Sequence, residues 1–196
     1  MNTLQSETAP ALVEKGKKRS GMVKFLIDVL ETLIWAVLLF VLINLVSARV
    51  RVDGASMLPT LTNGELVIVN KLAYRLGEPS RGDIIVFHFP VDPSQEFIKR
   101  VIGLPGDQVN IHKGAILING QRLEEPYLPV TTNYDGDWTV GDDQLFVLGD
   151  NRNNSLDSHN WGTVPMDYVI GKALFIYWPL NSLGIITHAE PQLVAP

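Results

Sequence analysis

The sequence predicts a mainly β protein: a single N-terminal transmembrane helix followed by an antiparallel β-sheet or barrel-like domain. First, residues 32–48 run for seventeen residues without a charge, at the short end of the ~17–25 that span a bilayer. Second, short β-branched runs separated by Gly, Pro, Asn and Asp fill the chain from Glu65 onward, as strands and turns do. Third, no amphipathic helix of normal length stands out after Ala48 in the sequence.

The membrane-spanning element is expected over residues 25–48, with Asp28 and Glu31 near one end, where headgroups or water can solvate them. A buried core helix is one alternative, but apolar residues surround this helix on all sides. A cleavable signal peptide is another, since Val46 and Ala48 make a small-residue pattern of the cleavage-site kind. The apolar core exceeds the ~7–15 residues usual for a signal peptide, which favours an uncleaved signal-anchor.

The charges on either side of this helix predict its orientation. After it, the nearest basic residues are only Arg49 and Arg51. Because basic residues concentrate on the cytoplasmic side, residues 1–24 are predicted to be a cytoplasmic basic tail and residues 49–196 an extracytoplasmic β domain. The basic residues that precede the helix are Lys15, Lys17, Lys18, Arg19 and Lys24.

The composition narrows the classes of function. A chain of 196 residues accommodates one anchor and one modest domain. It has no cysteine, which excludes a disulfide framework and a thiolate nucleophile. The formal charge of −5 argues against a nucleic-acid partner. The four histidines are scattered without zinc-ligand spacing, so we expect no metal and no cofactor.

Six segments of the second part are strand candidates, and "NG" at residues 119–120 is a strong hairpin signal. Residues 124–142 are rich in turn-forming residues and are interpreted as an excursion from the core. The last dozen residues carry little signal. The strand candidates are "ELVIVNKL", "GDIIVFHFP", "EFIKRVIGL", "AILINGQRL", "DQLFVLGD" and "VIGKALFIYW".

Ser56, in the link "GASMLPTL" after the anchor, is a candidate nucleophile, and Lys99 in "EFIKRVIGLPGD" is its candidate partner. Strand alternation places Lys99 on one face with Phe97 and Val101, while Arg100 faces the other way and needs its own carboxylate. An ammonium held among apolar groups loses hydration, which lowers its pKa. The neutral amine can then accept a proton from a serine hydroxyl. Taken alone, a lysine in a strand is more often a surface residue with a buried stem.

A third polar segment, "GDNRNNSLDSHNWGTVP" at residues 149–165, follows the strand "QLFVL". Loops of this composition mostly make turns. Here Ser155, Asp157 and Ser158 come together with Trp161. Such a loop can orient a base through a hydroxyl and hold a neighbouring strand through a carboxylate.

Together these segments resemble the type I signal peptidases of bacteria and their thylakoid relatives. "SMLPT" is similar to the family's nucleophile box, "FIKRVIGLPGD" to its general-base box and "GDNRNNSLDSHNWG" to its third box, in the family's order behind a signal-anchor. The resemblance implies that Ser56 is the nucleophile and Lys99 the general base. It also implies that Ser155 donates a hydrogen bond to the lysine amine and fixes its direction.

The resemblance implies supporting roles for four further residues. Asp150 would pair with Arg100, Asp157 would hold the loop of the third box, and Met57 would line the site near the substrate. The implied fold is a two-part antiparallel β catalytic domain of the signal peptidase type, with an apolar surface facing the membrane.

The implied activity is that of a serine endopeptidase that removes N-terminal signal peptides from exported preproteins. We expect cleavage after small residues at positions −1 and −3, because an extended peptide points alternate side chains into the protein. The implied partners are these signal peptides and the lipid bilayer, near the export translocon. The implied location is the plasma or inner membrane, or the thylakoid membrane.

Two positions depart from the family pattern. Gly54 stands where many members have a serine or threonine whose hydroxyl helps to bind the oxyanion, so we expect Gly54→Ser to be tolerated. His159 stands where arginine is usual, so its pair with Asp157 should be weaker and sensitive to pH. The family's variable extension is also short here, and residues 107–142 leave room for a small hairpin.

Three rival functions remain open at this point. A triad would join Ser56 to His88 or His159 and an aspartate. A non-catalytic membrane-anchored binding module would not need Ser56, Lys99 and Ser155 together. A self-cleaving repressor uses a similar Ser–Lys pair, but a transmembrane segment here occupies the place of its DNA-binding domain.

Overall fold

The computed structural model describes residues 21–128, 130–188 and 191–195. Lys15, Lys17, Lys18 and Arg19, on which the predicted orientation rests, lie outside the described residues. The chain divides into two compact units, and the boundary between Leu42 and Ile43 falls inside the first helix. The helix and the β domain are therefore described separately.

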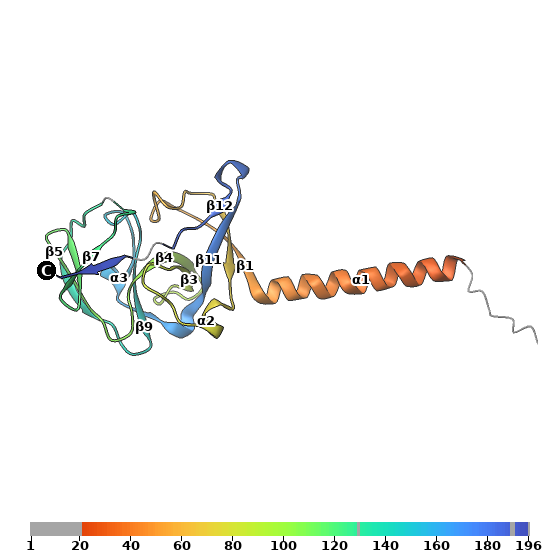
Figure 1. Ribbon diagram of the computed structural model, residues 1–196, viewed down its shortest axis with the longest axis horizontal. Helices are drawn as coiled ribbons and strands as arrows, with labels where there is room; N and C mark the ends of the chain where they lie inside the picture. Colours follow the sequence, from red (N-terminus) through yellow and green to blue (C-terminus); the bar gives the residue numbers. More distant parts are fainter. Residues whose placement is uncertain (1–20, 129, 189–190, 196) are drawn as a thin grey trace, which may run out of the picture. The chain divides into compact units, whose positions relative to one another are not determined.

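The single apolar helix expected from the sequence is α1, Gly21–Val46 (Figure 1). Its 26 residues rise about 39 Å at ~1.5 Å per residue, more than the ~30 Å of a hydrocarbon core. None of its side chains is buried, which argues against the core-helix alternative. The helix ends two residues earlier than expected, because Ser47 and Ala48 instead pair with Asn70 and Val69 as part of a strand.

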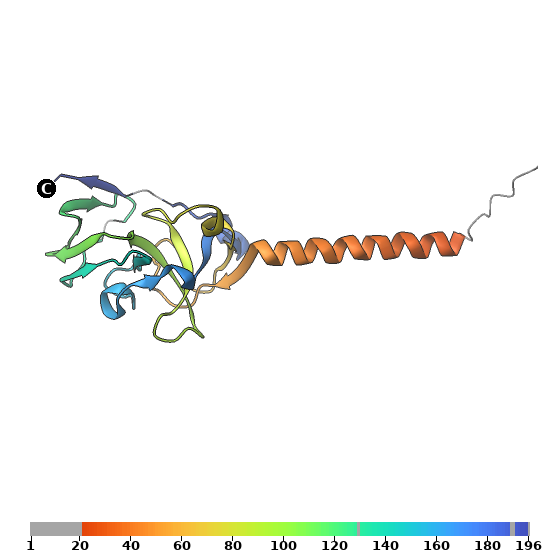
Figure 2. The ribbon, with the colours of Figure 1, turned by 90° about the horizontal axis from the view of Figure 1, so that it is seen from below.

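The β domain contains two antiparallel sheets, as predicted (Figures 1 and 2). Within the described residues, the larger sheet has eight strands in the order β1-β2-β11-β3-β4-β9-β10, with β12 paired to β11. The smaller sheet has five strands in the order β13-β7-β6-β5-β8. The strands are β1 Ser47–Arg51, β2 Leu66–Asn70, β3 Ile84–His88, β4 Glu96–Gly103, β5 Gln108–His112, β6 Ala115–Ile118, β7 Gln121–Glu124, β8 Gly136–Thr139, β9 Gln144–Leu148, β10 Val164–Pro165, β11 Val169–Trp178, β12 Gly184–Ile185 and β13 Gln192–Val194. The short helices are α2 Ala73–Leu76, α3 Ser158–Trp161, η1 Met166–Tyr168 and η2 Leu180–Ser182.

The smaller sheet is larger than the small hairpin expected for residues 107–142. Strands β5 to β8 lie in this segment, and β13 from the end of the chain pairs with β7. The alternating residues Val109, Ile111, Ile116 and Ile118 point inward and form a separate hydrophobic cluster with Phe146 of β9. Strands of four or five residues give a weak periodic signal in the sequence. The three residues of β13 give none, and they form a strand because they pair with β7.

Strand β4 lies between β3 and β9, and its residues from Ile98 to Gly103 are buried. It contributes a side chain to each hydrophobic cluster of the domain: Ile98 to the first, Ile102 to the second and Val101 to the third. A strand buried on both faces has no solvent side for a charge. The two consecutive basic residues in its middle must therefore find partners inside the protein.

Candidate active site

Ser56 lies in the loop between β1 and β2, in a tight turn over residues 54–60. The loop is closed at its base by backbone hydrogen bonds from Val52 N–H to the Glu65 carbonyl and from Gly64 N–H to the Val52 carbonyl, both 2.8 Å. Asn151, from the loop after β9, donates twice to the same turn. Its backbone N–H lies 2.9 Å from the Ser56 carbonyl oxygen, and its Nδ2 lies 3.0 Å from that of Ala55.

Lys99 extends from β4 to Ser56. Its Nζ donates to Ser56 Oγ at 2.8 Å and to the carbonyl oxygen of Ile98 at 3.0 Å. Only 4% of the residue is exposed. Burial lowers the pKa of the Lys99 amine to about 8, although the carboxylates of Asp157 and Asp150 oppose this shift. A large fraction of the amine is therefore neutral in mildly alkaline solution and able to accept a proton from Ser56.

Arg100, the neighbour of Lys99, points to the opposite side and meets Asp150. Its Nε and Nη2 each donate to one carboxylate oxygen at 2.7 Å, and Nη1 donates to the Gly82 carbonyl at 2.8 Å. The hydroxyl of Thr60, in the Ser56 turn, donates to the same carboxylate. Arg100 is 1% exposed and Asp150 is fully buried, so this bidentate pair is a desolvated link between β4, the loop after β9 and the Ser56 turn.

Asp157 organises the loop of residues 149–162. One carboxylate oxygen accepts from Gly149 N–H at 2.9 Å. The other accepts from His159 N–H at 3.2 Å and lies 2.6 Å from His159 Nδ1. Asp157 is also the N-cap of α3 and forms a capping box with Asn160. His159 stacks on Tyr134 with ring centroids 3.8 Å apart, so the histidine that replaces the usual arginine is held from two sides.

Ser155 does not make the hydrogen bond to Lys99 expected from the sequence. Its hydroxyl is buried and has no hydrogen-bond partner within the part of the chain that the structure describes. The lysine amine is already bonded to Ser56 and Ile98. Ser155 nevertheless lies near the site: a Cβ placed on Gly149 would fall 2.2 Å from Ser155 Oγ and 2.5 Å from the Ser56 carbonyl oxygen. Only glycine at position 149 permits this close approach.

The expectation that Met57 lines the site is wrong. Met57 is 1% exposed and packs in the core with Val52, Leu61 and Val67. Consecutive residues of a tight turn point in different directions, so a turn that aims Ser56 outward aims its neighbour inward. Met57 therefore anchors the turn from below.

A cavity of about 330 Å³ opens beside Ser56 and Lys99. Part of its wall is apolar, and it is bounded by the end of β1, the Ser56 turn, the start of β4 and the loop after β9. Such a wall can accept small apolar side chains of an extended peptide. The lining residues are Val50, Arg51, Asp53, Ser56, Gln95, Glu96, Phe97, Ile98, Lys99 and Leu156.

The histidines proposed for a triad lie elsewhere. His88 Nδ1 lies 3.1 Å from the Pro93 carbonyl oxygen in the β3–β4 hairpin, and His159 is bound to Asp157. Among the hydrogen bonds of the described residues, Ser56 Oγ is paired with Lys99. In the same described ranges, no group of three His, Asp or Glu side chains is arranged to hold a metal ion. The geometry therefore favours the lysine over either histidine as the base.

Three residues of this site were missed in the sequence: Asn151, Arg152 and Glu125. Asn151 holds the Ser56 turn, as described above. Arg152 donates through Nε to the Gly149 carbonyl at 3.1 Å and pairs with Glu125. Asn151 and Arg152 belong to the polar segment of residues 149–165, whose composition marks the segment but not these two residues within it. Glu125 lies in a segment interpreted as an excursion, and only the fold brings it to the site.

Comparison with known proteins gives a consistent result. Residues 26–178 match the family described as signal peptidase, peptidase S26. The chain is 50% identical over 142 residues to signal peptidase I of Leptolyngbya laminosa, covering 68% of this chain and 70% of that one. It is 41% identical over 187 residues to probable signal peptidase I-2 of Synechocystis sp., covering 91% and 85%. It is 37% identical over 147 residues to probable thylakoidal processing peptidase 2 of Arabidopsis thaliana, covering 71% and 40%.

The backbone conformation of Gly54 indicates that Gly54→Ser, which is expected from the sequence to be tolerated, destabilises the protein. Gly54 has φ of +97°, which L side chains rarely adopt, although a Cβ would meet open space. We expect Gly54→Ser to lower the free energy of unfolding by about 1–3 kcal/mol. Gly54→Asn should cost less, because asparagine adopts positive φ more readily. Thermal unfolding of the detergent-solubilised proteins checks this order, and a serine variant as stable as the parent would contradict it.

Proposed function

This chain belongs to the signal peptidase family, peptidase S26, and on that premise we propose that it cleaves preproteins with a catalytic dyad of Ser56 and Lys99. The observation that carries the proposal is the 2.8 Å contact between Ser56 Oγ and the Nζ of a buried lysine whose pKa is lowered to about 8. A serine is a weak nucleophile until a neighbouring base takes its proton. A lysine does so only when its amine is neutral, which burial favours here.

In the proposed reaction, neutral Lys99 accepts the hydroxyl proton as Ser56 Oγ attacks the scissile carbonyl carbon. The resulting ammonium donates this proton to the leaving amine as the peptide bond breaks. Lys99 then takes a proton from water as the water oxygen attacks the ester carbonyl of the acyl-enzyme. The ammonium returns this proton to Ser56 Oγ as the ester bond breaks, which releases the signal peptide and restores the neutral amine. The oxyanion is stabilised mainly by the backbone N–H of Ser56, because Gly54 offers no hydroxyl.

The remaining site residues act by positioning in this proposal. Arg100 and Asp150 hold β4 against the loop after β9, and Asp157 keeps that loop in shape. Ser155, buried against Gly149, supports the same loop by packing, and its hydroxyl has no hydrogen-bond partner among the described residues. Charge-assisted hydrogen bonds of this kind give the fixed geometry that proton transfer requires.

The protein is anchored in a membrane by α1. We propose that the chain before α1 is a cytoplasmic tail, that the anchor ends with α1 at Val46 and not at the predicted residue 48, and that the β domain from Ser47 onward acts on the extracytoplasmic side. The substrates are signal peptides of exported preproteins, presented at the bilayer near the export translocon. The thylakoid and the plasma or inner membrane both fit this topology.

We expect Lys99→Met to lower kcat/KM by at least about a hundredfold, because it keeps the apolar stem and removes the base. Lys99→Arg should fail as well, since a guanidinium stays charged. His88→Ala and His159→Ala should keep most of the activity. Assays of the four variants on one preprotein, with folding checked by circular dichroism, decide between dyad and triad. An active Lys99→Met beside an inactive histidine variant would exclude the dyad.

The proposed dyad also predicts how kcat/KM and the stability of the parent and of Lys99→Met depend on pH. In the parent protein, kcat/KM should rise as the pH increases through about 8, where the amine loses its proton. The pKa of this amine is about 8 in the folded protein and about 10.5 in the unfolded chain. Between pH 8 and 10.5 the unfolded chain therefore binds more protons than the folded protein, and the stability of the parent rises with pH across this window. Below pH 8 the protonated amine costs folding about 3 kcal/mol, which Lys99→Met removes. The variant should therefore unfold at a higher temperature at pH 7, and an equal or lower midpoint there would contradict the buried amine.

We expect a preprotein with leucine in place of alanine at position −1 to escape cleavage. In an extended substrate the −1 and −3 side chains point toward the same side, and in this proposal they meet the apolar part of the cavity wall beside Ser56, where a larger −1 side chain holds the scissile carbonyl away from Ser56 Oγ. Sequencing the N-terminus of the product from the alanine and leucine substrates checks this. Unchanged processing of the leucine substrate would remove the pocket from the proposal.

The proposed orientation predicts that protease added from the cytoplasmic side removes only the tail before α1. This orientation is predicted because Lys24 and four basic residues before α1 lie on the N-terminal side of the apolar span, and basic residues concentrate on the cytoplasmic side. Immunoblots of oriented vesicles, with and without detergent, report which part is protected. Digestion of the β domain from the cytoplasmic side of intact vesicles would overturn the topology.

A further inference from the structure

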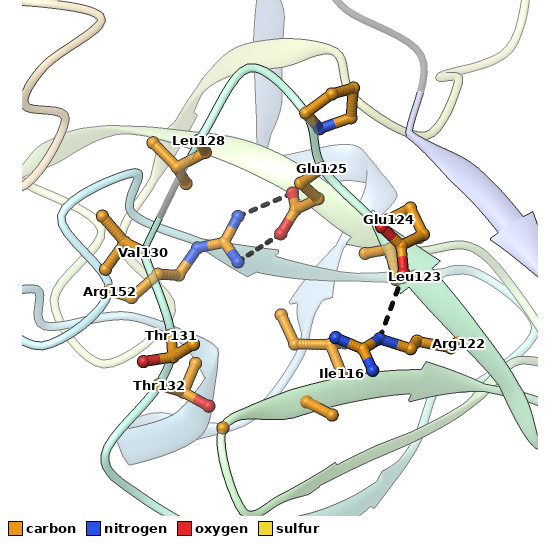
Figure 3. A pocket seen from close by; sticks show the side chains of 13 residues that line it. Ile116, Arg122, Leu123, Glu124, Glu125, Leu128, Val130, Thr131, Thr132 and Arg152 are labelled. Atoms are coloured by element: carbon orange, nitrogen blue, oxygen red, sulfur yellow. Dashed lines mark hydrogen bonds and ion pairs between the residues drawn. The ribbon is translucent and has the colours of Figure 1, made fainter.

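The segment after β7 contains Glu125, a partly buried residue whose side chain is largely covered. Glu125 accepts two hydrogen bonds from the guanidinium of Arg152, from Nη1 to Oε2 at 2.5 Å and from Nη2 to Oε1 at 2.7 Å (Figure 3). The side chains are 8% and 1% exposed. The preceding residue, Glu124, pairs instead with Arg122 at 3.2 Å, and both of these side chains are about half exposed. The side chain of Glu124 is thus about half exposed to solvent, whereas that of the next residue, Glu125, is largely covered.

Arg152 connects this glutamate to the Ser56 turn. Its Nε donates to the Gly149 carbonyl, and Gly149 packs so closely on the Ser56 carbonyl oxygen and on Ser155 that no side chain fits between them. The N–H of Gly149 is held by Asp157. A displacement of Gly149 therefore moves the surface against which the Ser56 turn rests.

Tyr127, two residues after Glu125, makes a second connection. Its hydroxyl donates to Glu125 Oε1 at 2.7 Å, and the guanidinium carbon of Arg100 lies 4.6 Å from the centre of its ring. Arg100 is the partner of Asp150. The three-residue segment that follows β7 of the smaller sheet thus contacts both buried arginines, Arg100 and Arg152.

Stability alone does not require such a pair. Two buried charges lose their hydration, and well-packed apolar residues often replace a buried ion pair at no cost in stability. What the ion pair supplies and apolar residues lack is direction: a bidentate contact fixes the guanidinium plane, and the plane fixes where Nε points. Here Nε points at Gly149.

We propose that Glu125 and Arg152, with Tyr127, are positioning residues through which the smaller sheet holds the loop after β9 against Ser56, so that the rate of cleavage depends on this ion pair. The proposal rests on the Ser56–Lys99 function proposed above. It assigns to the segment 125–127 a part in catalysis, although it touches neither Ser56 nor Lys99 in any hydrogen bond of the described residues.

The first test compares Glu125→Gln with the matched control Glu124→Gln in the full-length, detergent-solubilised protein. Both variants remove one negative charge at nearly the same place in the chain. We expect Glu125→Gln to lower kcat at least about tenfold with KM within about twofold of the parent, because small displacements of reacting groups are costly. Glu124→Gln should leave both constants unchanged. Rates are expressed per folded molecule, and a parental kcat for Glu125→Gln would overturn the proposal.

The second test separates positioning from stability. In the double variant Glu125→Leu with Arg152→Met, apolar side chains replace both charges, and we expect unfolding near the parental temperature. Because the contact to Gly149 is lost, kcat should stay at least about tenfold low. A double variant with parental stability and parental kcat would show that the pair is only structural. If the double variant does not fold, Glu125→Gln decides alone.

The midpoint of the pH dependence of kcat/KM is a further readout, because a loss of folded protein lowers the rate at every pH and leaves this midpoint unchanged. Asp150 and Asp157 raise the pKa of Lys99, but burial, the larger effect, lowers it. A loosened loop admits water, so the midpoint of kcat/KM in Glu125→Gln should shift upward from about 8, and an unmoved midpoint would count against the proposal. Ser56→Ala controls for the premise: if it stays active, the proposed dyad fails, whatever Glu125 does.

Discussion

The buried ion pair between Arg100 and Asp150 is the interaction on which the rest of the site depends. Strand β4 is buried on both faces, so a charge in its middle must be neutralised within the protein. Asp150 does this with two hydrogen bonds, and it comes from the loop that also supplies Ser155 and Asp157. Thr60 brings the Ser56 turn to the same carboxylate. One desolvated carboxylate thus joins the three segments that contain Ser56, Lys99 and Ser155.

Lys99, on the other side of the strand, has no carboxylate within hydrogen-bonding distance in the described structure, and this asymmetry suits it to the proposed role of base. Arg100 keeps its charge because Asp150 compensates for burial, whereas burial of Lys99 lowers the pKa of its amine. The same desolvation that weakens the fold at neutral pH produces a neutral amine beside a serine hydroxyl. If the proposed dyad acts as described, a more stable arrangement of these residues would be a poorer catalyst.

Part of this arrangement follows from the sequence alone. The uncharged run before Ala48 predicts the helix, and strand alternation places Lys99 and Arg100 on opposite faces, as the structure also has them. The smaller sheet, the direction of Met57 and the missing hydrogen bond between Ser155 and Lys99 were not predictable in this way. Short strands acquire their structure by pairing with segments far away in the chain, and a turn residue's direction depends on backbone angles that single residues do not specify.

The sequence by itself determined the anchor, the β class, the order of the three polar segments and the residue types able to do the chemistry. These properties are local, because they depend on composition, periodicity and neighbouring residues. Only the tertiary structure decided that Lys99 reaches Ser56, that Asn151 holds the Ser56 turn, and that Glu125 meets Arg152. Such contacts join residues between 27 and 96 positions apart. Their geometry depends on how the sheets pack, and that packing is a property of the whole chain.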